Sequence, residues 1–150
     1  MPKQAHLLLT ALLCAALGPL APVVAQAGVV VVGHPGMRKL DVATVERIYS
    51  GKVVELDGQP VVPVNLPPQH PLRQRFLKDF MQRDEPSYLA YWTVRRYVGK
   101  GAPPKEVGSA SEVVMHVLHN PGAIGYMEET DVPPGVNIVA RGAKVGGAAP

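Results

Sequence analysis

Cysteine is almost absent from this sequence: the single residue, Cys14, lies in an apolar run near the start of the chain. A chain without it has no disulfide, no thiolate metal ligand and no cysteine nucleophile. The chain also has no large excess of positive or negative residues. The formal net charge is +3, without a basic run or interleaved aromatic and basic residues, which argues against nucleic acid as a partner. After this first apolar run, no stretch of the sequence is long and apolar enough to span a membrane.

Residues 1–27 have the layout of a secretory signal peptide. A lysine precedes the apolar run from Leu7 to Leu17, and that run is too short to be a stable membrane anchor. Ala25 and Ala27 place small residues at both positions of a cleavage site. We therefore expect cleavage after Ala27, loss of Cys14 with the leader, and a periplasmic or secreted product that does not span the membrane.

The remaining chain has the size of one domain. About 123 residues are enough for a single compact core. We expect this α/β domain to cover residues 28–140. Residues 141–150 are rich in glycine and alanine and are expected to be a disordered tail.

The first half of the domain alternates strand and helix signals. Val29–Val32 is a continuous β-branched run, typical of a strand buried on both faces. Asp41 is a suitable cap for a helix that ends before Gly51. Residues 53–56 and 61–64 are expected to form a hairpin around the turn pair Asp57-Gly58.

The stretch from residue 61 to residue 81 predicts a strand, a proline-rich loop and an amphipathic helix that begins at Pro71. Such a loop at a helix N-terminus is a common anion site. Arg73 falls among the apolar positions of the helix, so its guanidinium needs a carboxylate, backbone carbonyls or a bound anion. The alternatives are that Arg73 reaches water, pairs with an acidic residue of the fold, or holds a ligand.

The second half of the chain predicts two more helices and two strands. Residues 87–98 carry apolar and aromatic side chains around most of a helix, which we expect to be largely buried. Ser109 and Glu112 form a capping box that opens the next helix. Residues 123–127 and, more weakly, 137–140 read as strands. About four helices should therefore flank a mixed, mostly buried sheet.

Residues with catalytic or metal-binding spacing are few. His116 and His119 lie three positions apart, a spacing that two ligands of one metal use, but both fall opposite the apolar stripe and are expected to be solvated. No serine-hydrolase elbow or metalloprotease motif is present. The sequence predicts neither an enzyme nor a cofactor.

Several short blocks resemble the phosphate ABC transporter substrate-binding proteins, which are periplasmic binding proteins of the second topological type. The resemblance covers about residues 29–127, and its most specific part is the segment Asn120–Met127. The blocks, in chain order, are IYSGK, VVPVN, AYW, GKGAPP and NPGAIGYM. The resemblance implies an α/β lobe with a largely covered sheet and a ligand site at the loop between the strand and the helix that begins at Pro71.

The chain departs from this family in two ways. Its length suffices for one lobe, whereas the family has two lobes that close on the ligand. At the phosphate loop, Asn65, Pro68, His70 and Leu72 stand where the family has Arg, Asp, Ser and Thr, and Pro71 removes a backbone donor. The location of a site is implied, with Asn65, Gln69, His70 and Arg73 as its candidate residues, while phosphate specificity is not.

Two functions follow from these features. The first is an extracytoplasmic, solute-binding-like module that takes a small anion or polar solute, with an ABC permease as a possible partner. The second is a ligand-free interaction module that docks on another protein of the cell envelope. A lobe without its partner lobe leaves its inner face exposed, and such a face often marks a protein contact. We therefore also expect a homodimer that rebuilds a cleft.

Overall fold

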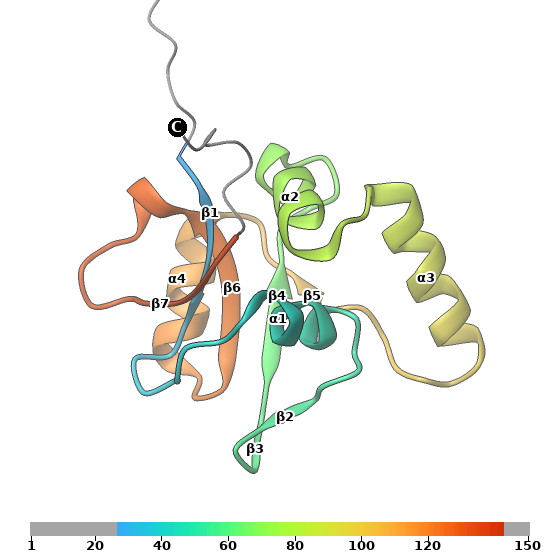
Figure 1. The fold of residues 1–150 in the computed structure, drawn as a ribbon, viewed down its shortest axis with the longest axis horizontal. Helices are drawn as coiled ribbons and strands as arrows, with labels where there is room; N and C mark the ends of the chain where they lie inside the picture. The colour runs from blue at the N-terminus through green and yellow to red at the C-terminus, as the bar shows by residue number, and fades with distance from the viewer. Residues whose placement is uncertain (1–26, 143–150) are drawn as a thin grey trace, which may run out of the picture.

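A computed structural model describes residues 27–142 as a five-stranded sheet with helices on both faces (Figure 1). The predicted leader, except Ala27, and residues 143–150 of the predicted tail lie outside the described residues. The strands and helices, in chain order, are β1 (Val29–Gly33), α1 (Val42–Tyr49), β2 (Glu55–Leu56), β3 (Gln59–Pro60), β4 (Val62–Asn65), α2 (Pro71–Phe76), the π-helical turn η1 (Leu77–Met81), α3 (Glu85–Tyr97), β5 (Lys105–Glu106), α4 (Ala110–His119), β6 (Ala123–Glu128), the 3-10 turn η2 (Glu129–Asp131) and β7 (Asn137–Arg141).

The sheet is mixed, with the strand order β5-β4-β6-β1-β7. Strand β4 runs parallel to β5 and β6, whereas β1 is antiparallel to both β6 and β7. Every residue of β1 is buried, which confirms the strand predicted from its valine run. Strand β7 extends through Arg141, one residue beyond the end expected for the domain.

Alternation along β6 shows how the helices cover the sheet. A side chain at Gly125 would collide with Val113 of α4, so α4 packs closely against one face. Tyr126 points to the other face, where its ring stacks on Phe76 of α2 at 4.0 Å between centroids and lies 6.1 Å from Tyr49 of α1. Helices α1 and α2 therefore cover the face opposite α4.

Local signals fixed most of the element boundaries. Asp41 and Asp84 cap α1 and α3 through their carboxylates, and Pro71 is the first residue of α2. Asp57 and Gly58 both have positive φ angles, of 52° and 77°, as the predicted tight turn requires. The strands of that hairpin are β2 and β3, shorter than expected, because Val62 already pairs with β6.

The helix expected from Pro71 to Met81 is not a regular α-helix. It changes at Leu77 into the π-helical turn η1, in which Leu77, Phe80 and Met81 are buried. The chain then leaves the helix at Gln82, which has a left-handed φ of 51°. This departure places residues 82–84 as a short bridge to α3.

The prediction that residues 87–98 are largely buried is wrong. In α3 only Tyr88 and Trp92 are buried, whereas Val94 is 62% and Tyr97 is 92% exposed. The helix lies at one end of the molecule, beyond α1 and α2 (Figure 1), and contacts the body along one stripe only. Its apolar outer face has no covering element among residues 27–142.

Candidate functional site

The loop after β4, where the family resemblance implies a site, begins at a buried asparagine. Asn65 is 1% exposed and is the last residue of β4. Its amide oxygen accepts a hydrogen bond from the Tyr126 hydroxyl at 2.5 Å, and its amide nitrogen lies 3.5 Å from the Tyr88 hydroxyl. The Tyr126 hydroxyl also accepts the backbone N–H of Leu66 at 3.0 Å. The side-chain amide of Asn65 therefore already has its hydrogen-bond partners within the fold.

Arg73 lies in the first turn of α2, directly after this loop, and is only 2% exposed. Its Nε and Nη2 donate to the two carboxylate oxygens of Glu85 at 2.8 and 2.6 Å, in a bidentate pair. Its Nη1 donates to the Leu66 carbonyl at 2.7 Å and to Glu106 at 2.8 Å. Of the alternatives for Arg73, the structure thus shows pairing with acidic residues of the fold.

The charges around Arg73 sum to an excess of negative charge. One guanidinium faces two carboxylates, Glu85 with 16% and Glu106 with 51% of its side chain exposed. Burial by itself lowers the pKa of Arg73, but the hydrogen bonds that Arg73 donates to Glu85 and Glu106 outweigh it and raise the pKa overall. A phosphate ion entering this place would meet both carboxylates and find four of the five guanidinium N–H donors already used.

The tyrosines beside Arg73 belong to the same buried network. The Arg73 guanidinium lies 5.6 Å from the centre of the Tyr88 ring, and the Tyr88 hydroxyl donates to the Tyr49 carbonyl at 3.1 Å. Burial raises the pKa of Tyr88 to about 12 and also raises the pKa of Tyr126. Three neutral side chains and one charged side chain therefore form a buried polar network whose members hydrogen-bond within the fold: Asn65, Tyr126, Tyr88 and Arg73.

The other two predicted site residues have local roles. His70 caps α2, because its Nδ1 accepts the backbone N–H of Leu72 at 3.2 Å. Gln69 lies on the surface, outside the buried network. The structure therefore brings Asn65 and Arg73 together but does not gather all four residues around one cavity.

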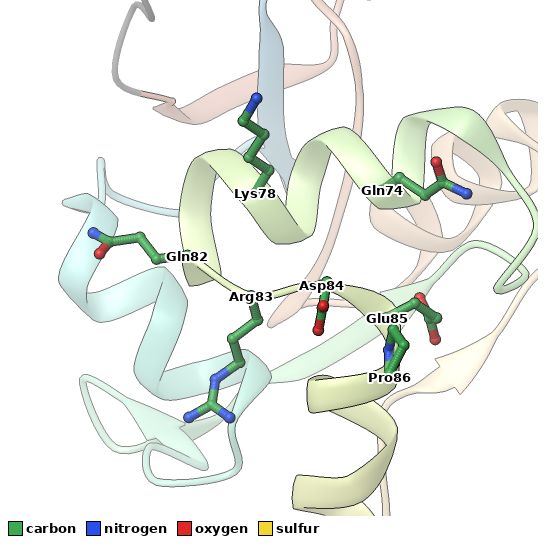
Figure 2. Close-up of a pocket in the computed structure, with 7 residues that line it drawn as sticks. All are labelled: Gln74, Lys78, Gln82, Arg83, Asp84, Glu85 and Pro86. Atoms are coloured by element: carbon green, nitrogen blue, oxygen red, sulfur yellow. The ribbon is translucent and has the colours of Figure 1, made fainter.

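A groove of about 660 Å³ opens next to this network, and sequence reasoning did not find it (Figure 2). Glu85 belongs to both, since it pairs with Arg73 and lines the groove. In the sequence, only the polar break Gln82-Arg83-Asp84 between two helices marks this place. The remaining lining residues lie on α2, on η1, on the bridge of residues 82–84 and in the first turn of α3: Gln74, Lys78, Gln82, Arg83, Asp84 and Pro86.

Lys78 and Arg83 are the two cations of the groove, and they extend to different sides of it (Figure 2). The Arg83 guanidinium lies 4.8 Å from the centre of the Tyr91 ring, in a cation–π contact. Two carboxylates, two side-chain amides and Pro86 complete the lining. This lining offers donors and acceptors of both charges around a mostly apolar exposed surface, and it suits a small organic molecule with a few polar groups better than a multiply charged anion.

Only one histidine of the α4 pair has the exposure that was expected for both. His116 is partly buried, its Nε2 has no hydrogen-bond partner among residues 27–142, and burial lowers its pKa. His119 instead lies on the surface, with its Nδ1 2.8 Å from the Met115 carbonyl. Within the described part of the chain, no three acidic, histidine or cysteine side chains are grouped so that they could hold a metal ion.

The described residues include no helix with the length and apolar character needed to cross a membrane. Neither a known protein family nor a curated protein matches the sequence. Solved structures do match, at 12–19% identity.

Three solved structures share the fold. A Clostridium perfringens protein described as a phosphate ABC transporter substrate-binding protein, with bound phosphate, is 18% identical, with a TM-score of 0.61 over 77% of this chain. A Vibrio cholerae ABC-type phosphate transport receptor is 19% identical, with a TM-score of 0.59 over 78% of this chain. PstS from Borrelia burgdorferi is 12% identical, with a TM-score of 0.57 over 77% of this chain.

The chain spans less than half of each of these proteins: 45% of the Clostridium chain, 49% of the Vibrio chain and 47% of the Borrelia chain. Both the predicted α/β class, with a mixed sheet and four helices, and the family resemblance are confirmed at the level of the fold. This protein therefore has the fold of a single lobe of the phosphate ABC transporter substrate-binding proteins.

Proposed function

We propose that this protein is an extracytoplasmic, solute-binding-like module that takes a small polar solute in the groove beside Arg73. The likeness to proteins described as transport receptors supports a binding role in place of catalysis. The leader-like residues 1–27 support a place outside the cytoplasm. Because those proteins are described as parts of ABC transport, a permease is the partner that the likeness suggests.

The observation that carries the proposal is the shift of the open space away from the family's phosphate loop. Arg73 makes four hydrogen bonds within the chain, and two carboxylates face it. The adjacent groove is open and is lined by Lys78, Arg83, Asp84 and two side-chain amides. A solute with both cationic and anionic groups, or a neutral polar one, matches this lining better than phosphate does.

Native mass spectrometry of the exported protein tests the proposal by looking for co-purified small molecules. A ligand found in this way should raise the melting temperature of the wild type, because a ligand at a hundred times its dissociation constant adds about 2.7 kcal/mol of stability. Lys78→Ala should reduce that rise, whereas Lys52→Ala should not. Lys52 is the matched control because it lies outside the groove and makes one exposed pair, with Glu46.

Phosphate provides the second half of the test. Millimolar phosphate should leave the melting temperature where chloride at equal ionic strength leaves it, because four of the five Arg73 donors are occupied and two carboxylates face them. A clear rise of the melting temperature with phosphate but not with chloride would contradict the proposal. It would mean that Glu85 or Glu106 moves aside and that the ligand binds at the loop after β4.

A second function, a ligand-free interaction module of the envelope, is favoured by a different observation. Every predicted site residue except Gln69 is engaged by the fold, while the outer face of α3 is apolar and open. A protein that co-purifies with no small molecule, and whose melting temperature does not respond to polar solutes of any charge type, would support this function over solute binding.

A further inference from the structure

Helix α3 carries two adjacent rows of exposed, mostly apolar side chains. Residues four apart stand above one another on a helix. Leu89, Thr93 and Tyr97 form one row, and all three are exposed. The neighbouring row, also exposed throughout, consists of Pro86, Ala90, Val94 and Val98.

Thr93 does not interrupt this apolar face. Its hydroxyl donates back to the Leu89 carbonyl at 2.9 Å, so the polar atom is used within the helix. Leu89 is 49%, Val94 62% and Tyr97 92% exposed. Large apolar side chains gathered at this exposure on one helix mark a contact surface far more often than a solvated one.

The opposite face of α3 already holds the helix to the body. Trp92 is 4% exposed, and the hydroxyls of Tyr88 and Tyr91 donate to the carbonyls of Tyr49 and Ser50 at 3.1 and 2.7 Å. Arg95 reaches back to the Gly51 carbonyl at 3.1 Å. The outer rows can therefore be covered without moving the helix.

The two ends of α3 carry opposite charges. Asp84 and Glu85 stand at the N-terminal end, and Arg95 and Arg96 lie in the last turn, followed by Lys100. The helix dipole has the opposite sense, positive at the start and negative at the end, so these charges stabilise each end of the helix. A second α3 laid antiparallel across the first would set Arg96 of each copy near Asp84 of the other, with both dipoles opposed favourably.

We propose that the outer face of α3 is a self-association surface, on which two copies of this chain pair their α3 helices antiparallel about a two-fold axis. Self-pairing fits because one patch supplies both halves of the contact, apolar rows against apolar rows and acidic end against basic end. Asp84 and Pro86 also line the groove (Figure 2), so the pairing brings Arg96 of the second copy to the groove mouth. The inference goes beyond the proposed function and does not depend on the identity of the solute.

Sedimentation velocity of the exported protein over a range of concentrations tests the pairing. The wild type should form a dimer as concentration rises. Tyr97→Lys and Val94→Lys should each weaken dimerisation by roughly tenfold or more, since each puts a charge in the centre of an apolar contact. Met115→Lys is the matched control: Met115 is 58% exposed but lies on α4, so its variant should dimerise like the wild type.

Arg96→Ala tests the orientation. Antiparallel helices predict weaker dimerisation, because an attraction to Asp84 is lost, and predict weakening by added salt in the wild type. A parallel pair would place the two Arg96 side chains together, and the same variant would then dimerise more strongly. Circular dichroism should show all variants folded.

A wild type that stays monomeric at every concentration would overturn the proposal. So would a dimer that Met115→Lys disrupts and Tyr97→Lys leaves intact, or one that Arg96→Ala strengthens. None of these results would change the outcome of the solute and phosphate tests, so the two proposals fail separately.

Discussion

Arg73 and Tyr97 reverse the usual placement of their residue types. The arginine is 2% exposed and the tyrosine 92% exposed. The buried charge is stable because Glu85, Glu106 and the Leu66 carbonyl surround its donors. The exposed aromatic has nothing comparable in the described chain. The polar groups around the loop after β4 thus find partners within the fold, whereas the outer face of α3 stays open in residues 27–142.

The largest expected effect comes from opening the completed region. Arg73→Ala should cost about 3–5 kcal/mol of unfolding free energy, because it leaves the largely buried Glu85 carboxylate without a partner. Urea unfolding measures this. Arg75→Ala serves as the control. Arg75 pairs with Glu128 where both side chains are partly exposed, so its loss should cost no more than about 1 kcal/mol. Equal costs for the two variants would contradict the contrast.

Alkaline unfolding tests the same region through its tyrosines. The pKa of Tyr88 in the folded state is about 12, whereas an unfolded tyrosine has a pKa near 10. The unfolded state therefore loses its proton first. Stability is fully present below about pH 10 and falls as the pH rises toward 12, by about 2–3 kcal/mol.

The pH series compares the wild type with Tyr88→Phe by urea unfolding at each pH. The variant should lose less stability between pH 10 and pH 12 than the wild type. An identical slope for both proteins would show that the Tyr88 hydroxyl is not the group responsible.

Removing one hydroxyl from the network should have a smaller effect. Tyr126→Phe leaves the Leu66 N–H and the Asn65 amide oxygen without their partner, a loss of about 1–3 kcal/mol. Thermal or urea unfolding near neutral pH measures it. A neutral result would mean that water replaces the hydroxyl, and that the region is less closed than its hydrogen bonds indicate.

The smallest effect is expected on α3. Val94→Ser changes a side chain that is 62% exposed, and should alter the stability of the monomer by no more than about 0.5 kcal/mol. Dilute protein should be used so that association does not contribute. A loss near that of Tyr126→Phe would mean that the outer face of α3 is packed within one chain.

Signals carried by neighbouring residues were predictable from the sequence. The valine run of β1, the cap at Asp41 and the turn at Asp57-Gly58 depend on local geometry, and the structure confirms each of them. The capping box at Ser109 is also present, although Glu112 reaches the N–H of Gly108 instead of that of Ser109.

Features that depend on distant residues were not predictable. Glu106 lies 33 positions from Arg73, and no local pattern shows that the chain brings them together. The exposure of α3 was missed for a related reason. Its apolar residues indicate contact, but the sequence does not say whether the contact lies within one chain or between two. The groove depends on the direction in which the chain leaves η1 at Gln82, and that direction follows from tertiary packing.

The place of β1 in the sheet has a consequence for how the chain folds. This first strand is hydrogen-bonded on both sides to late strands: Val31 pairs with Tyr126 of β6 and with Ala140 of β7. Both pairings close loops of about 100 residues, and contacts so distant in sequence slow folding. Until the last two strands are available, β1 has no partner on either edge, so the central core forms only when nearly the whole domain is present.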